Sequence, residues 1–264
     1  MNLLAFDTST DALSLAVGRG LSAQQQVWQH SGPGGAQASS SLINAIMGLL
    51  RQADVRLADL DAICFGSGPG SFTGLRTACS VAQGLAFGAN VPVLPVPSLL
   101  ALAQAARSHA APAATQGRMI ALLDARMEEI YAASYAFDGV RWTLLQPPCL
   151  VAPEDVVNWS CLSAPAAGAP LWQAFAGNVV GVYGDRLRLA PEDVYVAALP
   201  TAVAILQLAP ALLAAGQAVP ASQALPLYVR DKVAKTTLER EAEKADKADK
   251  AQLLARQASA APHA

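Results

Sequence analysis

The sequence is poor in charged residues and in histidine. Only 14% of its 264 residues are charged, and the three histidines are His30, His109 and His263. No His-Glu-x-x-His or His-x-x-x-His pair is present, so a zinc or iron centre has no evident ligands and we expect no metal site. The formal net charge of −2 argues against a surface that binds nucleic acid through many phosphate contacts.

Cysteine is scarce, and the sequence predicts neither a signal peptide nor a membrane span. The four cysteines form no Cys-x-x-Cys pair, which predicts buried free thiols in a reducing compartment. The N-terminus has no basic region and meets an acid at Asp7, so no signal peptide is expected. The longest uncharged run, residues 194–229, is cut by prolines into pieces too short to span a bilayer. We expect a soluble cytoplasmic protein without membrane contact.

Lysine is absent from most of the chain. All five lysines fall between Lys232 and Lys250, whereas residues 1–230 hold 11 arginines and 14 acidic residues. Residues 231–264 alternate charge of both signs and show no apolar stripe before Leu253. This composition predicts a flexible charged tail, 231–264, that contributes nothing to the core.

Apolar residues are abundant, at 53%, and their spacing predicts an α/β protein. Three short apolar runs separated by turns predict an antiparallel meander, and alternating helical and strand patterns follow them. The expected strands are 2–6, 13–18, 23–28, 61–66 and 91–96; the expected helices are 39–53, 71–87 and 98–107, with a loop at 32–35. Such an order implies a mixed sheet with helices on its faces.

The pattern of the first half then starts again. Residues 4–7 (LAFD) are echoed 117 residues later by residues 121–124 (ALLD), and strands are expected at 130–137 and 140–145, joined by a turn at Asp138. We interpret this as a duplicated lobe, with lobes 1–108 and 109–230. Weaker patterns predict a loop over 147–170, a strand at 179–184, and a helix over 200–216 that breaks at Pro210.

Two segments could carry chemistry. The turn Asp7-Thr8-Ser9-Thr10 offers hydroxyls, backbone N–H groups and a carboxylate, which could bind a phosphate and a hydrated Mg²⁺. Spacing alone favours the alternative, a polar turn whose side chains satisfy backbone groups. The segment 66–76 (GSGPGSFTGLR) places glycines before a helix, but no lysine follows and Pro69 removes an N–H, which disfavours a phosphate loop.

The helices 39–53 and 71–87 carry more apolar and small residues than one buried stripe needs. Gly74, Ala78 and Ala82 recur every four residues, and a helical glycine costs stability unless another backbone approaches closely. That backbone could belong to the chain's own sheet or to a partner helix. We predict a helical dimer surface, on which Gly74→Leu or Ala78→Leu would weaken association but leave the fold intact. Its expected members are Leu42, Ile43, Ile46, Met47, Leu50, Ser71, Phe72, Gly74, Leu75, Ala78 and Ala82.

Five blocks of sequence together resemble the bacterial TsaB (YeaZ) family. They are residues 4–10 (LAFDTST), 65–76 (FGSGPGSFTGLR), 82–86 (AQGLA), 124–131 (DARMEEIY) and 226–230 (PLYVR). The resemblance implies an actin-like ATPase-domain (ASKHA) fold, made of two ribonuclease-H-like lobes, each with a mixed sheet flanked by helices. It also implies a role in forming N6-threonylcarbamoyladenosine at position 37 of tRNA. In that role the chain would be a non-catalytic partner that binds and activates the paralogue TsaD, together with TsaE.

The resemblance carries further expectations about binding. The two helices would pair with TsaD, or with a second copy when TsaD is absent, and tRNA would be contacted only through the complex. Ser98 and Leu102 stand where the catalytic paralogue has its histidine pair, so the metal site is lost. Arg126 lies in the second-lobe turn, where a nucleotide would need space. No cofactor is therefore expected on this chain alone, and ATP would bind at a composite site of the complex.

Two other functions stay open at this stage. The first is an ATP-dependent phosphotransferase of the same superfamily, which would bind ATP unaided and lose it on Asp7→Ala. The second, less favoured, is a peptidase, against which the scarcity of histidine counts.

Overall fold

The computed structural model describes residues 1–20, 26–110, 116–161 and 172–230. The chain divides into a compact unit, Met1–Val229, and a second unit, Arg230–Ala264. The predicted charged tail 231–264 lies outside the described residues. None of the helices in the described ranges is long and apolar enough to cross a membrane.

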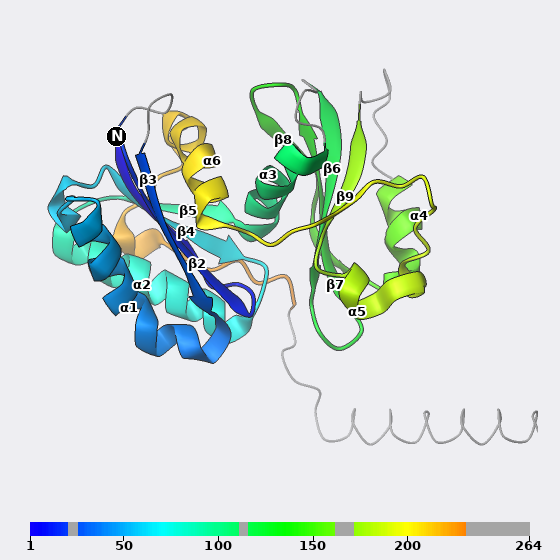
Figure 1. Cartoon of the computed structure of the whole chain (residues 1–264), viewed down its shortest axis with the longest axis horizontal. Coiled ribbons are helices and arrows are strands. Elements are labelled where there is room, and N and C mark those ends of the chain that lie inside the picture. The colour runs from blue at the N-terminus through cyan, green and yellow to red at the C-terminus, as the bar shows by residue number, and fades with distance from the viewer. Residues whose placement is uncertain (21–25, 111–115, 162–171, 231–264) are drawn as a thin grey trace, which may run out of the picture. The chain divides into compact units, whose positions relative to one another are not determined.

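The first sheet has the predicted meander and the predicted parallel additions (Figure 1). Its strands run in the spatial order β3-β2-β1-β4-β5; β1 pairs antiparallel with β2 and β2 with β3, whereas β4 pairs parallel with β1 and β5. Strand β4 is buried at every residue because helices cover both faces of the sheet there. The bounds are β1 Asn2–Asp7, β2 Ala12–Arg19, β3 Gln26–Pro33, β4 Ala62–Gly68 and β5 Val93–Pro97.

The three helices predicted in the first half are confirmed: α1 Gly35–Gln52, α2 Phe72–Ala89 and α3 Ser98–Ala110. The Ser71 hydroxyl caps α2 by accepting a hydrogen bond from the Gly74 N–H, and Asn90 ends the helix in a left-handed conformation. The loop predicted at 32–35 is wrong, because β3 extends to Pro33 and α1 begins at Gly35. Gly34 alone makes the connection. A side chain would not fit there, because a Cβ would lie 2.5 Å from the Thr10 carbonyl oxygen.

The second sheet repeats the topology of the first, which confirms the predicted duplication. Its order, β10-β9-β6-β7-β8, matches the first sheet strand for strand when β6 is equated with β1. Asp7 and Asp124 end the equivalent strands β1 and β6. The fold is therefore the actin-like arrangement of two lobes, each a mixed sheet flanked by helices. The bounds are β6 Gly117–Asp124, β7 Ile130–Phe137, β8 Trp142–Val151, β9 Gln173–Gly177 and β10 Tyr195–Ala197.

Three predictions for the second half are wrong. The loop predicted over 147–170 is wrong for 147–161, where the end of β8 and α4 Val156–Cys161 are found, and residues 162–170 lie outside the described residues. The strand expected at 179–184 is helical, as α5 Val180–Tyr183; the strand is β9, which ends at Gly177, where a Cβ would meet the Leu122 carbonyl oxygen at 1.7 Å. Helix α6, Ala202–Ala214, continues through Pro210 because the burial of neighbours such as Leu206 and Ala209 holds the segment in place.

Three clusters of buried side chains make up the core. One lies between the first sheet and helices α1 and α2, and another lies between the second sheet and helices α4 and α5. The largest joins the remaining faces of both sheets to helices α3 and α6, which contact each other. Burial in this cluster raises the pKa of the Cys64 thiol to about 12.

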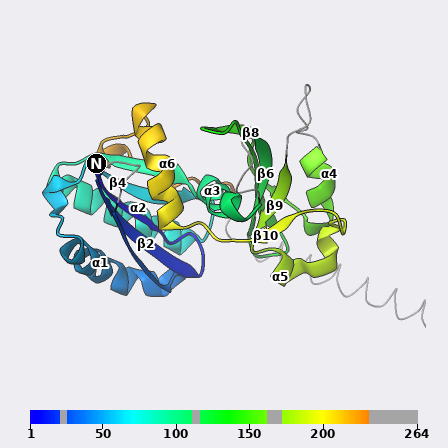
Figure 2. The same ribbon diagram turned by 45° about the horizontal axis from the view of Figure 1, so that its top comes forward.

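Helix α6 packs on the sheet of the first lobe although it comes late in the chain. It contacts β1, β2, β4 and β5, and in both Figure 1 and Figure 2 it lies beside that sheet. Residue Val219 then pairs with Val93 of β5. A boundary at residue 108 stays a prediction, but residues 202–224 contribute to the core of the first lobe.

Candidate functional site: the closed turn and the outer face of helices α1 and α2

The β1–β2 turn is built around the buried carboxylate of Asp7, which is 1% exposed. Its Oδ1 accepts hydrogen bonds from the Ser9 N–H (2.8 Å) and the Ser9 hydroxyl (2.6 Å). Its Oδ2 accepts one from the Ser98 hydroxyl (2.8 Å), which in turn accepts from the Gly68 N–H. Burial raises the pKa of Asp7 above its ordinary value, although the hydrogen bonds oppose this shift. The geometry is that of the polar turn, the interpretation that spacing favoured.

The glycine-rich segment 66–74 closes over this turn. The Thr8 hydroxyl donates to the Gly74 carbonyl oxygen (2.7 Å), and the Ser71 N–H donates to the Ser9 carbonyl oxygen (2.7 Å). A Cβ on Gly74 would lie 1.8 Å from the Thr8 carbonyl oxygen, and one on Gly70 would lie 2.4 Å from that of Ser9. Glycine at these two positions therefore lets the β1–β2 turn pack directly against the backbone of this segment. Of the four residues predicted to bind phosphate, Asp7, Thr8 and Ser9 are buried against it, and only Thr10 is partly exposed.

The equivalent turn of the second lobe places Arg126 between two acidic side chains. Arg126 forms ion pairs with Asp11 (2.5 Å) and with Asp124 (3.4 Å), and Asp124 also accepts a hydrogen bond from the Tyr183 hydroxyl. Residues 126–128 all have positive φ, a strained conformation for residues other than glycine. The Arg126 side chain is 68% exposed, so the pair with Asp11 contributes little stability, but it joins the two turns.

The two positions equated with the lost histidine pair lie in the core. Ser98 and Leu102 are both 0% exposed, and the Ser98 hydroxyl is used by Asp7 and Gly68. Within the described ranges, no three histidine, cysteine, aspartate or glutamate side chains lie close enough together to hold a metal ion.

Most residues predicted to form the interface face the first sheet instead. The small stripe of α2 packs inward, because Gly74 touches Thr8, and Ala78 and Ala82 belong to the core. The prediction that these side chains meet a partner, and that Gly74→Leu or Ala78→Leu would spare the fold, is therefore corrected. The members buried in this way are Leu42, Ile46, Leu50, Gly74, Leu75, Ala78 and Ala82.

The accessible face of these helices carries a different set of residues. On α1, Ile43 and Met47 are 50% and 39% exposed, and on α2 Phe87 is 85% exposed. A second row of small residues, here called the outer stripe, runs along the solvent side of α2. It comprises Thr73, Thr77, Ser80, Gly84 and Gly88. A Cβ on Gly84 or Gly88 would meet nothing within 4 Å, so nothing in the described residues requires glycine there.

The partly buried residues Ser71 and Phe72 lie at the start of this face. A shallow groove of about 490 Å³ runs along it and is lined mainly by Phe72 and the first half of the outer stripe. The sequence analysis missed this row. Its spacing of three to four residues from Thr73 to Gly88 is visible in the sequence, but composition does not show which of two small stripes faces the sheet.

The segment before Arg230 fixes the start of α2. The Phe72 and Tyr228 rings lie 5.3 Å apart, Arg76 stacks on Phe72, and its Nε donates to the Tyr228 hydroxyl (3.1 Å). The Leu227 N–H donates to the Ser67 carbonyl oxygen (2.7 Å). Residues 226–230 entered the sequence analysis only as one block of the family resemblance, with no structural role assigned to them.

A first prediction concerns the buried carboxylate of Asp7. Because its pKa is raised on folding, the folded state binds the proton more tightly than the unfolded state, and stability falls as pH rises from the ordinary aspartate pKa through the raised value. Asp7→Asn keeps an acceptor for Ser9 and removes the buried charge, while its N–H₂ group, in place of Oδ2, donates to the Ser98 hydroxyl oxygen. We expect it to raise the free energy of unfolding by about 1 kcal/mol at neutral pH and to leave it nearly unchanged in acid. Urea denaturation between pH 4 and 8 measures this.

The matched control is Asp59→Asn. Asp59 is paired with Arg56 at the surface, which lowers its pKa, so its replacement should not stabilise the protein at any pH. A D7N variant less stable than the parent at neutral pH would show that the hydrogen bonds to the carboxylate outweigh its desolvation.

A second prediction separates the two stripes of α2. Ala78→Leu overpacks the core and should lower the free energy of unfolding by about 1–3 kcal/mol. Thr77→Leu, one residue along on the solvent side, should change it by less than about 0.5 kcal/mol. Thermal and urea denaturation of both variants give the comparison. Equal destabilisation by the two would contradict the orientation of the helix.

Comparison with known proteins gives consistent results. The TsaD family model, described as tRNA N6-adenosine threonylcarbamoyltransferase, matches residues 23–255. The tRNA threonylcarbamoyladenosine biosynthesis protein TsaB of Escherichia coli is 33% identical over 239 residues, covering 89% of this chain and 96% of the relative. The TsaB of Haemophilus influenzae is 31% identical over 244 residues, covering 88% and 95%.

Solved structures agree with these relatives. YeaZ from Pseudomonas aeruginosa superposes with a TM-score of 0.71 at 35% identity, covering 86% of this chain and 99% of that one. A second Pseudomonas aeruginosa structure, described as an uncharacterized protein with similarity to peptidase YeaZ, gives a TM-score of 0.72 at 37% identity, covering 87% and 99%. The chain therefore belongs to the TsaB (YeaZ) family of tRNA threonylcarbamoyladenosine biosynthesis proteins.

Proposed function

We propose that this chain is a non-catalytic subunit that binds a TsaD paralogue and activates it in forming N6-threonylcarbamoyladenosine at position 37 of tRNA. Family membership supports the pathway. The single observation that carries the proposed role is the outer face of α1 and α2, where exposed apolar side chains flank a row of small residues.

The outer stripe suits a closely packed helix of another protein. Each helical glycine costs roughly 0.5–1 kcal/mol relative to alanine, and Gly84 and Gly88 gain no compensating contact from the described residues. Small residues let two helix backbones approach each other, while Ile43, Met47 and Phe87 supply apolar area at the edges. We assign this face to TsaD, and to a second copy of the chain when TsaD is absent.

The closed turn supports a role without catalysis by this chain alone. Thr8 and Ser9, which would face a nucleotide's phosphates, are buried against residues 70–74, and Arg126 reaches across to Asp11. The buried Ser98 and Leu102 replace the ligands of the catalytic paralogue. We assign ATP to a composite site that TsaD and TsaE help to form. We assign the contact with tRNA to the complex as a whole, in keeping with the net charge of −2.

Reconstitution tests the proposal directly. A mixture of TsaC, TsaD, TsaE, ATP, threonine, bicarbonate and an ANN-decoding tRNA transcript should form the modified nucleoside only when this chain is added. The chain without TsaD should give no product. Undiminished product without the chain would refute the proposed role. Product from the chain without TsaD would show that it is itself catalytic.

A substitution on the outer stripe tests the assigned face. Gly84→Arg places a long side chain on the solvent side of α2, so binding to TsaD should weaken at least about tenfold and product formation should fall with it. Because arginine forms helix better than glycine, the free energy of unfolding should stay the same or rise by about 0.5–1 kcal/mol. Calorimetric titration with TsaD and urea denaturation measure the two quantities.

The matched control is Gly181→Arg in α5. Gly181 is also a helical glycine at which an added Cβ would meet nothing within 4 Å, but it lies in the second lobe. The substitution should leave TsaD binding and product formation unchanged. Full TsaD binding by G84R, or an equal loss of binding in both variants, would show that the outer stripe is not part of the interface.

A further inference from the structure

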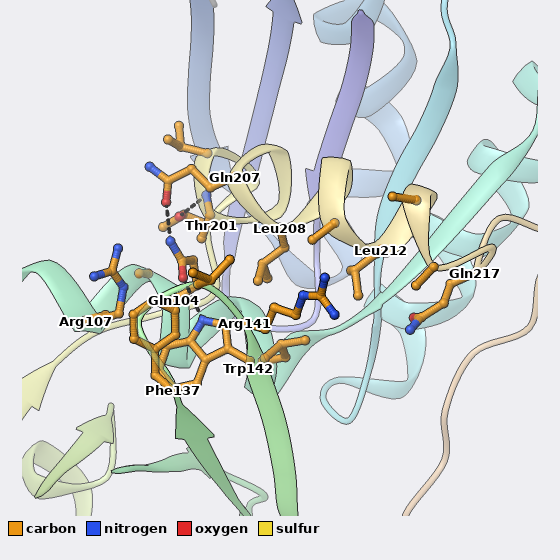
Figure 3. Close-up of a pocket in the computed structure, with 18 of the residues that line it drawn as sticks. Gln104, Arg107, Phe137, Arg141, Trp142, Thr201, Gln207, Leu208, Leu212 and Gln217 are labelled. Atoms are coloured by element: carbon orange, nitrogen blue, oxygen red, sulfur yellow. Dashed lines mark hydrogen bonds between the residues drawn. The ribbon is translucent and has the colours of Figure 1, made fainter. Parts of the chain in front are cut away.

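A large cavity lies away from the outer stripe and from the β1–β2 turn. Its volume is about 1050 Å³, and its walls are helix α3, helix α6 and the hairpin that joins β7 to β8 (Figure 3). None of its lining residues belongs to the closed turn, the glycine-rich segment or helices α1 and α2. The volume suits a drug-sized small molecule.

The floor of the cavity is aromatic and held in one orientation. The Trp142 ring lies 4.9 Å from that of Phe137 and meets Tyr135 edge-on at 6.4 Å. The indole N–H donates to Gln104 Oε1 (2.7 Å), and the Gln104 amide donates to Gln207 Oε1 (2.8 Å), as the dashed lines in Figure 3 show. Opposite this floor, α6 contributes an apolar wall that includes Leu208, Ala211 and Leu212. A flat apolar body could lie between them.

The charge of the lining is of one sign. Arg107 and Arg141 line the cavity, and no aspartate or glutamate does. Neither guanidinium forms an ion pair within the described residues. Arg107 stacks on Phe137 at 4.5 Å, and its Nε is buried without a hydrogen-bond partner. The acid of the hairpin, Asp138, does not line the cavity; it accepts from the backbone N–H groups of Val140 and Arg141, and the Arg141 charge also helps to lower its pKa.

Several side-chain donors of the lining have no acceptor among the described residues. The chain of bonds from Trp142 through Gln104 ends on the oxygen of Gln207, which leaves the amide N–H₂ of Gln207 unused. The Thr201 hydroxyl accepts a hydrogen bond from the Ala204 N–H, and its own hydrogen is available to a ligand. Together with the guanidinium groups of Arg107 and Arg141, these donors suit an acidic group. The planar guanidinium matches the geometry of a carboxylate or phosphate particularly well.

We propose that this cavity binds a small organic anion with a flat apolar body. Its carboxylate, phosphate or sulfonate group lies against Arg141 or Arg107, and its ring lies between the aromatic floor and α6. The inference does not rest on the role proposed with TsaD, since the two surfaces share no residue.

A matched pair of fluorescent probes tests this with the full chain. The anion 8-anilinonaphthalene-1-sulfonate should bind one to one and saturably, at least about tenfold more tightly than its uncharged analogue N-phenyl-1-naphthylamine. Arg141→Gln should cut affinity for the sulfonate about tenfold or more and leave the neutral probe unchanged. The control Arg51→Gln, on α1, removes an exposed guanidinium elsewhere and should change neither.

Filling the space gives an independent test. Ala211 is exposed and lines the cavity, so Ala211→Trp occupies it without entering the core, and both probes should lose their binding. An unchanged melting temperature shows that the fold is kept. Equal affinity for the two probes, an affinity for the sulfonate that neither Arg141→Gln nor Arg107→Gln lowers, or binding that survives A211W would overturn the proposal.

Discussion

The first lobe is organised around the buried side chain of Asp7, at the point where four segments meet. Asp7 ends the central strand, and its oxygens hold Ser9 of its own turn and Ser98 at the start of α3. No side chain fits on Gly66, because a Cβ there would lie 1.7 Å from Asp7 Oδ2. Close packing of this kind tolerates no added atom. The end of β1, the glycine-rich segment and the starts of α2 and α3 are thereby held together.

This closure also determines what the lobe can present to other molecules. Because the turn presses against Gly74, the inner stripe of α2 is committed to the sheet, and the outer stripe is left for solvent or for a partner. Thr8 and Ser9 of this turn are buried against residues 70–74. The proposed role as a binding subunit therefore draws both of its structural arguments, the buried turn and the free outer face, from one short segment.

Much of the fold could be predicted from sequence, for reasons that individual elements make clear. Strands β1 and β4 are short apolar runs bounded by turns, and the echo of residues 4–7 at 121–124 reflects equivalent strands of two sheets with one topology. The failures have physical causes as well. Val179–Gly184 is too short for strand and helix to be told apart, and α2 has two small stripes whose burial only the sheet decides. The cavity was missed because its walls come from three distant parts of the chain.

The two candidate surfaces belong to helices on opposite faces of the first sheet. Helices α1 and α2 cover one face of the first sheet, whereas α6 covers its other face and meets α3 there. The outer stripe and the cavity therefore belong to helices whose inner sides are buried in different clusters, with the first sheet between them. A molecule bound in the cavity contacts α6 but no residue of α2, so it could influence a partner on the outer stripe only through that sheet. The sheet is tightly packed at β1 and β4, with almost no exposed side chain, which makes it a stiff layer between the two surfaces.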